Sequence, residues 1–313
     1  MTGQNQRVTA VIPTIGRASL TASIESALAQ REVDLEVTVI ADRPKGRIES
    51  IGLLHDFEGR VQVRWTGGGK GGSYARQLGT AEATTPWVAY LDDDDLWLAG
   101  KLRRQLDEAN TRPDPLRCVV SCQSRSVDTA TGQTQEPIPA IVYDGSEALA
   151  RWLFHRRRLS AKRALMPTPT LLVPTDLARA AGWRRLPRHQ DWDFVLRLAA
   201  LDEVEILQVP EILVQFAVGS PSSISSEARW EASLAWAESM RNSWDEATYA
   251  DFVAGQPLRY ALQGRDLRGV TTVLRSLPRT RLPTGRAMVL AASGLGGRDL
   301  FDRALHRDRG ASG

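Results

Sequence analysis

The sequence predicts an α/β fold built on a mainly parallel sheet and followed by a helical annex. Three observations support this expectation. Short apolar runs alternate with helical patterns early in the chain, one of these runs ends in four consecutive aspartates, and the pattern becomes purely helical after a serine-rich segment. With 313 residues, 42% of them hydrophobic, the chain is long enough to bury a large core.

Four apolar runs define the strands expected in the first part of the chain: VTAVI at 8–12, EVTVIA at 36–41, VQVRW at 61–65 and WVAYL at 87–91. A helix is expected after the first run, because Leu20, Ile24 and Leu28 recur every fourth residue. A second helix is expected after Ser73, a residue type that caps helices well. Strands that alternate with helices in this way lie parallel to one another.

The elements expected beyond residue 101 are less regular. They are a helix directly after 101, a strand at 117–122, a loop or hairpin at 128–139, an extended segment at 170–173, a helix from 191, and strands at 204–210 and 211–216. The serine cluster at 220–226 marks a boundary, since the pattern after it is purely helical. We therefore expect an α/β domain at 1–225 and a helical annex at 226–313.

Composition excludes several classes of protein. The two cysteines, Cys118 and Cys122, are too few for a disulfide scaffold and are not spaced like a metal-binding pair, so we expect a reducing compartment. Forty basic against 37 acidic residues give a net charge of +3, too near balance to indicate nucleic-acid binding. Neither a signal peptide nor a membrane-spanning run is recognisable, which predicts a cytoplasmic protein. The four histidines are too scattered for a zinc site, and His189 is expected to be a hydrogen-bonded structural residue.

Four consecutive aspartates, Asp92 to Asp95, follow directly on the expected strand at 87–91. Like charges this close raise one another's pKa values and repel, so a divalent cation is expected to neutralise them. Carboxylate oxygens suit Mg²⁺ or Mn²⁺, and the carboxyl ends of parallel strands are where open α/β sheets bind ligands. The alternative is an acidic cap on the following helix, for which one aspartate would suffice.

Three further features could carry chemistry. Asp191 begins the expected helix in HQDWDF, where it either caps the helix or serves as a general base; the pattern leaves both open. The glycine-rich stretch at 66–73 lacks the spacing of a nucleotide-binding P-loop, but Ser73 and nearby amides could approach an anion. Trp97 and Trp192 flank the two acidic points and either stack on a sugar or lie in the core.

Several segments, in this order, resemble those of the inverting GT-A glycosyltransferases of family 2. The similar segments are VTAVIPTIGRASL, EVTVIAD, GGSYARQLGTAEATTPWVAYLDDDDLWLAGKL, HQDWDFVLRLA, and VPEILVQF with the serine-rich stretch after it. They cover about residues 7–226 and leave out the annex. The resemblance implies a GT-A fold, which is a Rossmann-like, mostly parallel central sheet flanked by helices.

The resemblance also implies roles for individual residues. Asp191 corresponds to the catalytic base, and Asp92 and Asp94 correspond to the aspartates that hold Mn²⁺ or Mg²⁺. The residues implied in donor binding are Pro13, Thr14, Arg17, Asp42, Ser73, Arg76, Asp92 and Asp93. The histidine that many members carry before the serine-rich loop is absent near 216–218.

The expected function is therefore metal-dependent, inverting transfer of a sugar from a nucleoside-diphosphate sugar, a UDP-sugar first of all, to a hydroxyl of a saccharide or lipid-linked acceptor. Such chemistry belongs to cell-surface polysaccharide or glycoconjugate synthesis. Two alternatives remain: a catalytically degenerate GT-A module that acts as a binding or assembly partner, and a sugar-1-phosphate nucleotidyltransferase. The arginines between Arg265 and Arg286 suggest a peripheral contact of the annex with the inner face of an anionic membrane, although a solvated basic face is the alternative.

Overall fold

The structure is a computed structural model of the whole chain, and it describes residues 6–45, 57, 59–128, 131–134, 137–155, 164–218 and 230–307, with side chains up to 296. The chain forms two compact units. The first comprises Met1–Gly145, Leu165–Leu186 and Gln190–Pro221, and the second comprises Ser146–Ala164, Pro187–His189 and Ser222–Gly313. The serine cluster at 220–226, where we placed the domain boundary, lies outside the described residues.

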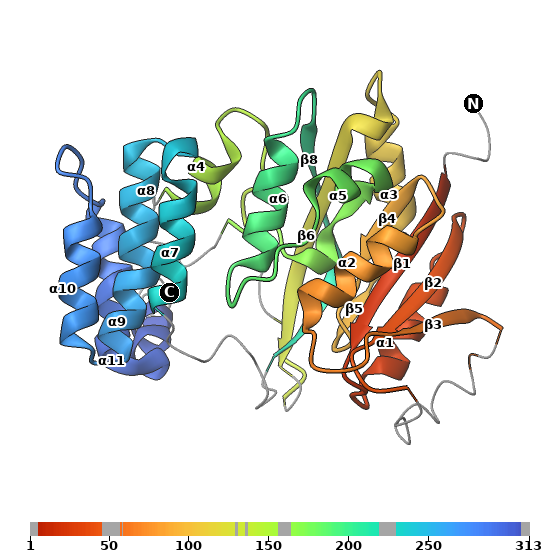
Figure 1. Cartoon of the computed structure of the whole chain (residues 1–313), viewed down its shortest axis with the longest axis horizontal. Coiled ribbons are helices and arrows are strands. Elements are labelled where there is room, and N and C mark those ends of the chain that lie inside the picture. The colour runs from red at the N-terminus through yellow and green to blue at the C-terminus, as the bar shows by residue number, and fades with distance from the viewer. Residues whose placement is uncertain are drawn as a thin grey trace. The chain divides into compact units, whose positions relative to one another are not determined.

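The first unit is organised around an eight-stranded sheet with the order β3-β2-β1-β4-β7-β6-β8-β5 (Figure 1). The strands are β1 (Arg7–Thr14), β2 (Asp34–Ala41), β3 (Val61–Trp65), β4 (Trp87–Tyr90), β5 (Asp95–Trp97), β6 (Cys118–Asp128), β7 (Leu172–Pro174) and β8 (Glu205–Val218). Neighbours from β3 to β4 pair in parallel, as do β6 and β8, whereas β7 and β5 run antiparallel to their neighbours. The expected α/β fold with a mainly parallel sheet is confirmed.

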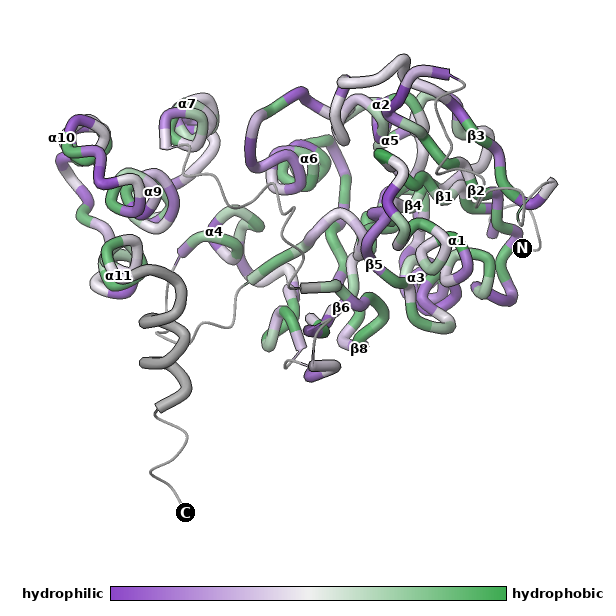
Figure 2. Tube along the Cα trace, turned by 90° about the horizontal axis from the view of Figure 1, so that it is seen from below, coloured by the Kyte–Doolittle hydropathy of each residue, from purple (hydrophilic) through white to green (hydrophobic). Residues whose placement is uncertain are grey.

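Helices cover both faces of this sheet. The helices of the first unit are α1 (Leu20–Leu28), α2 (Gly72–Glu82), α3 (Lys101–Ala109), α5 (Thr175–Ala181) and α6 (Gln190–Ala199), with short 3-10 turns at Pro115–Arg117 and Thr168–Thr170. In Figure 2, α1 and α3 lie on one side of the central strands, and α2, α5 and α6 lie on the other. Every residue of β1 after Arg7 is buried, because both faces of the strand are covered.

The sheet departs from the sequence expectation at one strand. We expected separate strands at 204–210 and 211–216, but β8 is continuous from Glu205 to Val218. Its pairing with β6 shifts register around Gln123, which is opposite Ile212, just after Pro210. Proline cannot donate to the ladder, and a bulge accommodates it without ending the strand. The stretch at 128–139 forms isolated antiparallel bridges, Ser124 with Ile138 and Val127 with Thr134, as expected of a hairpin.

The second unit is helical, as expected for the C-terminal region. Its helices are α4 (Leu149–Phe154), α7 (Trp230–Met240), α8 (Glu246–Val253), α9 (Arg259–Gln263), α10 (Leu267–Ser276) and α11 (Gly285–Arg307), with a 3-10 turn at Arg241–Ser243 and a π-helical turn at Ala254–Leu258. Aromatic rings fill its core, where Phe154, Trp236, Trp244 and Phe252 lie with ring centroids 4.9–6.2 Å apart. None of the described helices combines the length and apolarity needed to cross a membrane.

His189 belongs to this aromatic core of the second unit. Its Nε2 lies 2.7 Å from Ser233 Oγ, and its ring centroid lies 5.0 Å from Trp236 and 5.4 Å from Phe252. Burial, together with the positive charges of Arg188 and Arg259, lowers the pKa of His189 to about 3. The structure thus supports the structural interpretation of this histidine.

His189 is predicted to make the stability of the protein depend on pH. Because its folded pKa of about 3 is below the usual value of 6.5, the unfolded chain binds a proton first. The stabilising contribution is therefore complete above pH 6.5 and is lost as the pH falls toward 3, by up to about 1.4 kcal/mol per pH unit. His189→Asn tolerates the left-handed backbone found there, with φ of 63°, and does not titrate. Chemical unfolding from pH 7 to 4 should show a shallower decline for the variant, and parallel curves would contradict the prediction.

Candidate active site

The carboxyl ends of β1, β2 and β4 meet at one edge of the sheet. Thr14 ends β1 and lies opposite Ala41 at the end of β2, and the amide of Asp42 donates to the Thr14 carbonyl at 2.8 Å. β4 runs parallel to the other side of β1 and leads into Asp92. Parallel pairing therefore brings Thr14, Asp42 and the aspartate run to the same edge, where open α/β sheets bind ligands.

Asp93 is held from two sides by groups that follow β1. Arg17 Nη1 donates to its Oδ1 at 2.6 Å, and Thr14 Oγ1 donates to its Oδ2 at 2.5 Å. The side chain is 4% exposed, so both oxygens find their partners within the protein. The same Arg17 nitrogen lies 3.1 Å from Asp94 Oδ2 and links the two carboxylates.

Asp92 pairs with Arg76, a buried arginine on α2. Nη2 of Arg76 donates to Asp92 Oδ1, and its Cζ lies 5.2 Å from the ring centroid of Trp183. Burial alone would lower the pKa of Arg76, but the carboxylates of Asp92 and Asp191 outweigh it and raise that pKa. The charge of Arg76 therefore interacts with both the aspartate run and Asp191.

The rest of the aspartate run remains poorly neutralised. Burial raises the pKa of Asp94, and the charges of Asp92 and Asp93 add to the rise against the opposing effect of Arg17. Asp95 is 7% exposed on β5, where burial and the neighbouring carboxylates raise its pKa well above the usual value. Among the described residues, the ion pairs of this run come from Arg17 and Arg76. Four carboxylates thus face two guanidinium groups.

The alternative in which these aspartates cap the next helix is wrong. Asp95 begins strand β5, which pairs antiparallel with β8. Helix α3 starts only at Lys101, with Gly100 at its N-cap position. The aspartates are thus on the turn between β4 and β5, at the edge of the sheet.

Asp191 lies in the first turn of α6, and its Oδ2 accepts a hydrogen bond from the Thr168 amide at 3.2 Å. Its neighbour Asp193 differs, since it is fully buried and forms ion pairs with Arg197 at 2.8 Å and Arg184 at 3.5 Å. Asp193 therefore has a structural role. Asp191 is partly exposed, and its charge interacts with that of Arg76.

Asp42 fastens the glycine-rich loop that precedes α2. Its carboxylate accepts hydrogen bonds from Thr66 Oγ1, from the Lys70 amide at 2.9 Å and from the Gly71 amide at 2.7 Å. Burial alone would raise the pKa of Asp42, but these three hydrogen bonds lower it. The loop leads into Ser73 on α2, whose buried Oγ has no hydrogen-bond partner among the described residues. The Ser73 hydroxyl is therefore available to a ligand that binds at the start of α2.

The two tryptophans proposed for acceptor stacking have different surroundings. Trp97 is 3% exposed in the hydrophobic core, its Nε1 donates to the Pro169 carbonyl at 3.0 Å, and Lys101 Nζ lies 4.4 Å from its ring centroid. Of the two alternatives for Trp97, this burial favours a place in the core over stacking on a sugar. Trp192 is only partly buried on α6, so its role stays a prediction.

Two contacts of the site were not expected from the sequence. Trp183 stacks near Arg76, and the Thr168 amide binds Asp191. Both residues come from the segment Leu165–Leu186, far along the chain from the aspartate run. No local motif marks them, because they are placed by tertiary packing: α5, which precedes Trp183, packs on α2, and the 3-10 turn that contains Thr168 packs on β4, β6 and β8.

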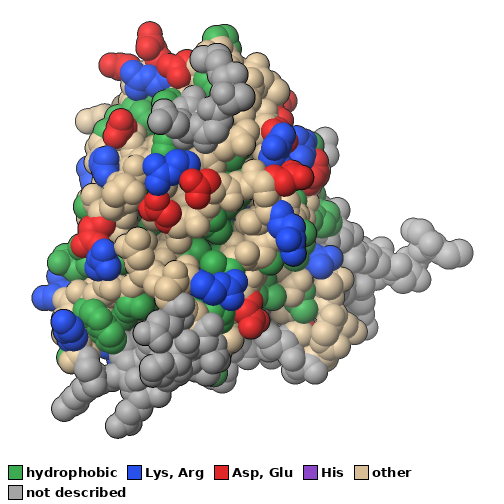
Figure 3. Space-filling model, turned by 90° about the vertical axis from the view of Figure 1, so that its right-hand side faces the viewer, with side chains coloured by type: hydrophobic (Ala, Val, Ile, Leu, Met, Phe, Trp, Pro, Cys, Tyr) green, Lys and Arg blue, Asp and Glu red, His purple; other side chains and the backbone are tan. Residues whose placement is uncertain are grey.

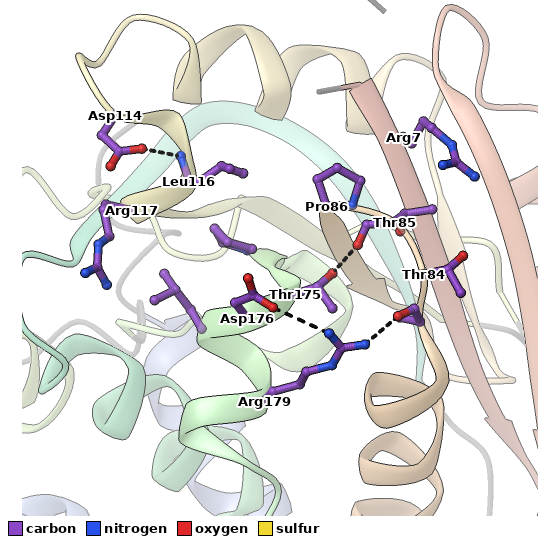
Figure 4. A pocket seen from close by; sticks show the side chains of 13 residues that line it. Arg7, Thr84, Thr85, Pro86, Asp114, Leu116, Arg117, Thr175, Asp176 and Arg179 are labelled. Atoms are coloured by element: carbon purple, nitrogen blue, oxygen red, sulfur yellow. Dashed lines mark hydrogen bonds and ion pairs between the residues drawn. The ribbon is translucent and has the colours of Figure 1, made fainter. Parts of the chain in front are cut away.

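A separate cavity of about 920 Å³ lies at the opposite end of the parallel strands (Figure 4). Arg7 at the start of β1 and Pro86 just before β4 line it. Two of the three arginines that line it have partners within the protein: Arg179 donates to the Ala83 carbonyl at 2.6 Å, and Arg7 pairs with Glu36 at 2.6 Å. This cavity is therefore remote from the candidate active site.

Asp42 is predicted to order the glycine-rich loop. Asp42→Ala removes the acceptor of three hydrogen bonds and should lower the free energy of unfolding by about 1–3 kcal/mol. Backbone amides at 67–71 should exchange with deuterium faster, as measured by mass spectrometry. Asp34→Ala, which removes an exposed carboxylate from the start of β2, is the matched control. Unchanged exchange in the Asp42 variant would contradict the assignment.

Comparisons with known proteins agree with this arrangement. A family model described as glycosyl transferase family 2 matches residues 9–167. An uncharacterized glycosyltransferase of Rickettsia bellii (strain RML369-C) is 36% identical over 107 residues, which are 33% of this chain and 15% of that relative. The chain thus matches less than a sixth of the length of this curated relative.

Solved structures of S. aureus TarS share the fold. TarS residues 1–349 in complex with UDP-GlcNAc gives a TM-score of 0.59 at 16% identity, over 96% of this chain and 88% of that one. The longer TarS structure gives 0.57 at 14% identity, over 96% and 55% of the two chains. These likenesses confirm the expected GT-A fold class. Since the family model matches half of the chain, in the region that supplies β1, β2, β4 and the aspartate run, the chain belongs to glycosyl transferase family 2.

Proposed function

We propose that this protein transfers a sugar from a nucleoside-diphosphate sugar to an acceptor hydroxyl with inversion at the anomeric carbon. The observation that carries the proposal is the electrostatic link between Asp92, Arg76 and Asp191 at the carboxyl edge of the sheet. Through Arg76, the aspartate run that is suited to bind the sugar donor and its cation is linked to Asp191, which is suited to act as a general base. Membership of family 2 supports the same conclusion.

The residues at the edge fit a divalent cation in chemistry and charge. Carboxylate oxygens are hard ligands suited to Mn²⁺ or Mg²⁺. Burial, and after it the charges of Asp92 and Asp93, raise the pKa of Asp94, and a cation would offset both effects. No group of three or more histidine, cysteine or acidic side chains able to hold a metal is found in the described residues. Asp92 and Asp94, the pair implied by the family resemblance, would hold the ion together with donor phosphates. When bound, it would supply Lewis-acid stabilisation of the departing diphosphate.

The chain's own residues supply the remaining steps. Asp191 accepts the proton of the acceptor hydroxyl while that oxygen forms a bond to the anomeric carbon. The bond from this carbon to the diphosphate oxygen breaks, and the nucleoside diphosphate leaves with the electron pair. The Thr168 amide orients Asp191 through its Oδ2, which leaves Oδ1 for the proton. Arg76 keeps its positive charge and holds Asp92 in position.

We further propose a UDP-sugar as the donor and a saccharide or lipid-linked hydroxyl as the acceptor, in cell-surface polysaccharide or glycoconjugate synthesis in the cytoplasm. The similarity to TarS structures in complex with UDP-GlcNAc and with UDP supports the choice of nucleotide. Pro13, Thr14, Arg17, Asp42, Ser73, Arg76, Asp92 and Asp93 remain the proposed donor-binding residues. Ser73 is supported by its unpartnered hydroxyl.

One observation favours the alternative of a degenerate module. Arg17 already supplies positive charge to Asp93 and Asp94, the place where a cation is expected. A binding or assembly module would keep this pairing and need no metal. A metal-dependent response to a nucleotide therefore separates the two functions.

Asp191→Asn is predicted to abolish the base while keeping the acceptor for the Thr168 amide. The rate of transfer should fall by about 10² to 10⁴-fold, the usual contribution of a general base, with donor affinity unchanged. Donor affinity is measured by calorimetry and transfer by release of the nucleoside diphosphate. Release of pyrophosphate would instead indicate a nucleotidyltransferase. Unchanged transfer in the variant would remove Asp191 from its role.

Asp94→Asn is predicted to abolish metal-dependent stabilisation by the nucleotide. In a thermal-shift panel with Mn²⁺, UDP at a hundred times its dissociation constant should stabilise the wild type by about 2.7 kcal/mol. The variant should show no metal-dependent shift. Asp107→Asn, on the exposed side of α3, makes the same chemical change away from the site and should respond like the wild type. If no nucleotide shifts the wild type with or without metal, the degenerate module becomes the better description.

A further inference from the structure

The second unit contains an unusual stretch of sequence between residues 265 and 295, which forms α10, the segment after it and the start of α11. Most of the large apolar side chains that are exposed in the described residues lie here, with exposed fractions of 42–81%: Leu267, Leu274, Leu282, Met288, Val289 and Leu295. Six arginines are interleaved with them: Arg265, Arg268, Arg275, Arg279, Arg281 and Arg286. Four of them, Leu267, Arg268, Leu274 and Arg275, lie on the same helix, α10, and we call these four residues the arginine–leucine surface.

The packing of α10 explains why its leucines lie outside. The helix faces the interior with Gly269 and Val273, its two buried residues. At Gly269 the approach is so close that a Cβ would lie 2.6 Å from Trp230 Nε1. Helical geometry then places Leu267 and Leu274, seven residues apart, together on the outer side, next to Arg268 and Arg275. Apolar and basic stripes thus run side by side along the outer side of α10, which Figure 2 draws nearly end-on.

The arginines between 265 and 286 meet little negative charge of the protein, although the charge of Arg268, after the hydrogen bonds from Gly269 and Trp230, helps to lower the pKa of Asp266. None of the six forms an ion pair with a described residue, although arginines elsewhere, such as Arg64 and Arg112, pair with glutamates. The only acidic residue between 265 and 295 is Asp266, whose carboxylate accepts from the Gly269 amide at 2.9 Å and from Trp230 Nε1 at 2.8 Å. On the face drawn in Figure 3, by contrast, acidic and basic side chains are interspersed.

We infer that the arginine–leucine surface docks on an anionic lipid bilayer. A polyanion in water would neutralise the arginines but leave the leucines in water. A second copy of the chain would bury the leucines but bring the arginines of α10 against those of its partner, which like-charge repulsion opposes. A bilayer meets both requirements, since the leucines enter the boundary of the acyl chains while the arginines reach the lipid phosphates.

The first test is co-sedimentation of the full chain with vesicles, without donor or acceptor, so that it does not depend on the proposed function. Binding is expected to vesicles of phosphatidylcholine with phosphatidylglycerol and to be much weaker with phosphatidylcholine alone. Raising the salt from about 0.1 M to about 1 M should weaken binding, because the screening length falls from about 10 Å to about 3 Å. Equal binding to neutral vesicles, or none to anionic ones, would overturn the inference.

Variants then separate the two parts of the surface. Arg268→Gln with Arg275→Gln should weaken partitioning by about 30-fold, since each arginine near an anionic surface contributes about fivefold. Leu267→Ser with Leu274→Ser should weaken it at least about tenfold through lost apolar burial. The matched controls in the first unit are Arg31→Gln with Arg60→Gln, and Ile141→Ser, at exposed positions. They should bind like the wild type.

Circular dichroism and thermal unfolding establish that each variant folds, and the exposed positions make this the expected result. Loss of binding in the arginine variant but not in the leucine variant would identify a surface for soluble polyanions and overturn the membrane assignment. A wild-type dimer in light scattering that the leucine variant dissociates would identify a second copy as the occupant, and this result would also overturn it.

Discussion

The accumulation of negative charge at Asp92 to Asp95 is the constraint on which the candidate site depends. Four carboxylates at the end of a buried strand are stable only if positive groups reach them. Arg17 comes from the segment after β1, and Arg76 comes from α2. Each is placed by the sheet, since β1 lies next to β4 and α2 packs on β1. The pairing of β1 with β4 thus places the aspartates at the sheet edge and also brings Arg17 and Arg76 next to them.

The aspartates of this run differ in how well their charges are compensated. Asp93 is buried and satisfied by Thr14 and Arg17, so it acts as an internal anchor for the turn. Asp94 is more exposed, and its pKa is raised by burial and by its neighbours. The turn is thus anchored at Asp93 and carries an under-neutralised carboxylate at Asp94, which supports the proposed cation. Asp42 similarly anchors the glycine-rich loop on the other side of β1.

The second unit is built on a different principle. Its stability comes from packed aromatic rings and from helix contacts such as Gly269 against Trp230. Because these contacts occupy the inner sides of the helices, the leucines and arginines at 265–295 remain outside. His189, whose pKa is lowered to about 3 by burial and by Arg188 and Arg259, belongs to the same core. The helical pattern of the annex does not by itself show which leucines are buried and which are exposed. The packing contacts of each helix, such as Gly269 against Trp230, decide this.

The sequence by itself determined the β–α alternation, the positions of the first four strands along the chain and the edge at which the aspartates lie. These properties follow from local periodicity and from the rule that parallel strands end together. It also pointed to Asp191 without deciding between a helix cap and a base. Tertiary structure decided the rest: that Asp93 is satisfied internally, that Arg76 stands between Asp92 and Asp191, and that Thr168 orients Asp191. It also decided that Trp97 belongs to the core, because β5 pairs with β8 and carries the ring inward. Such outcomes depend on contacts between residues far apart in the chain, and no local pattern encodes them.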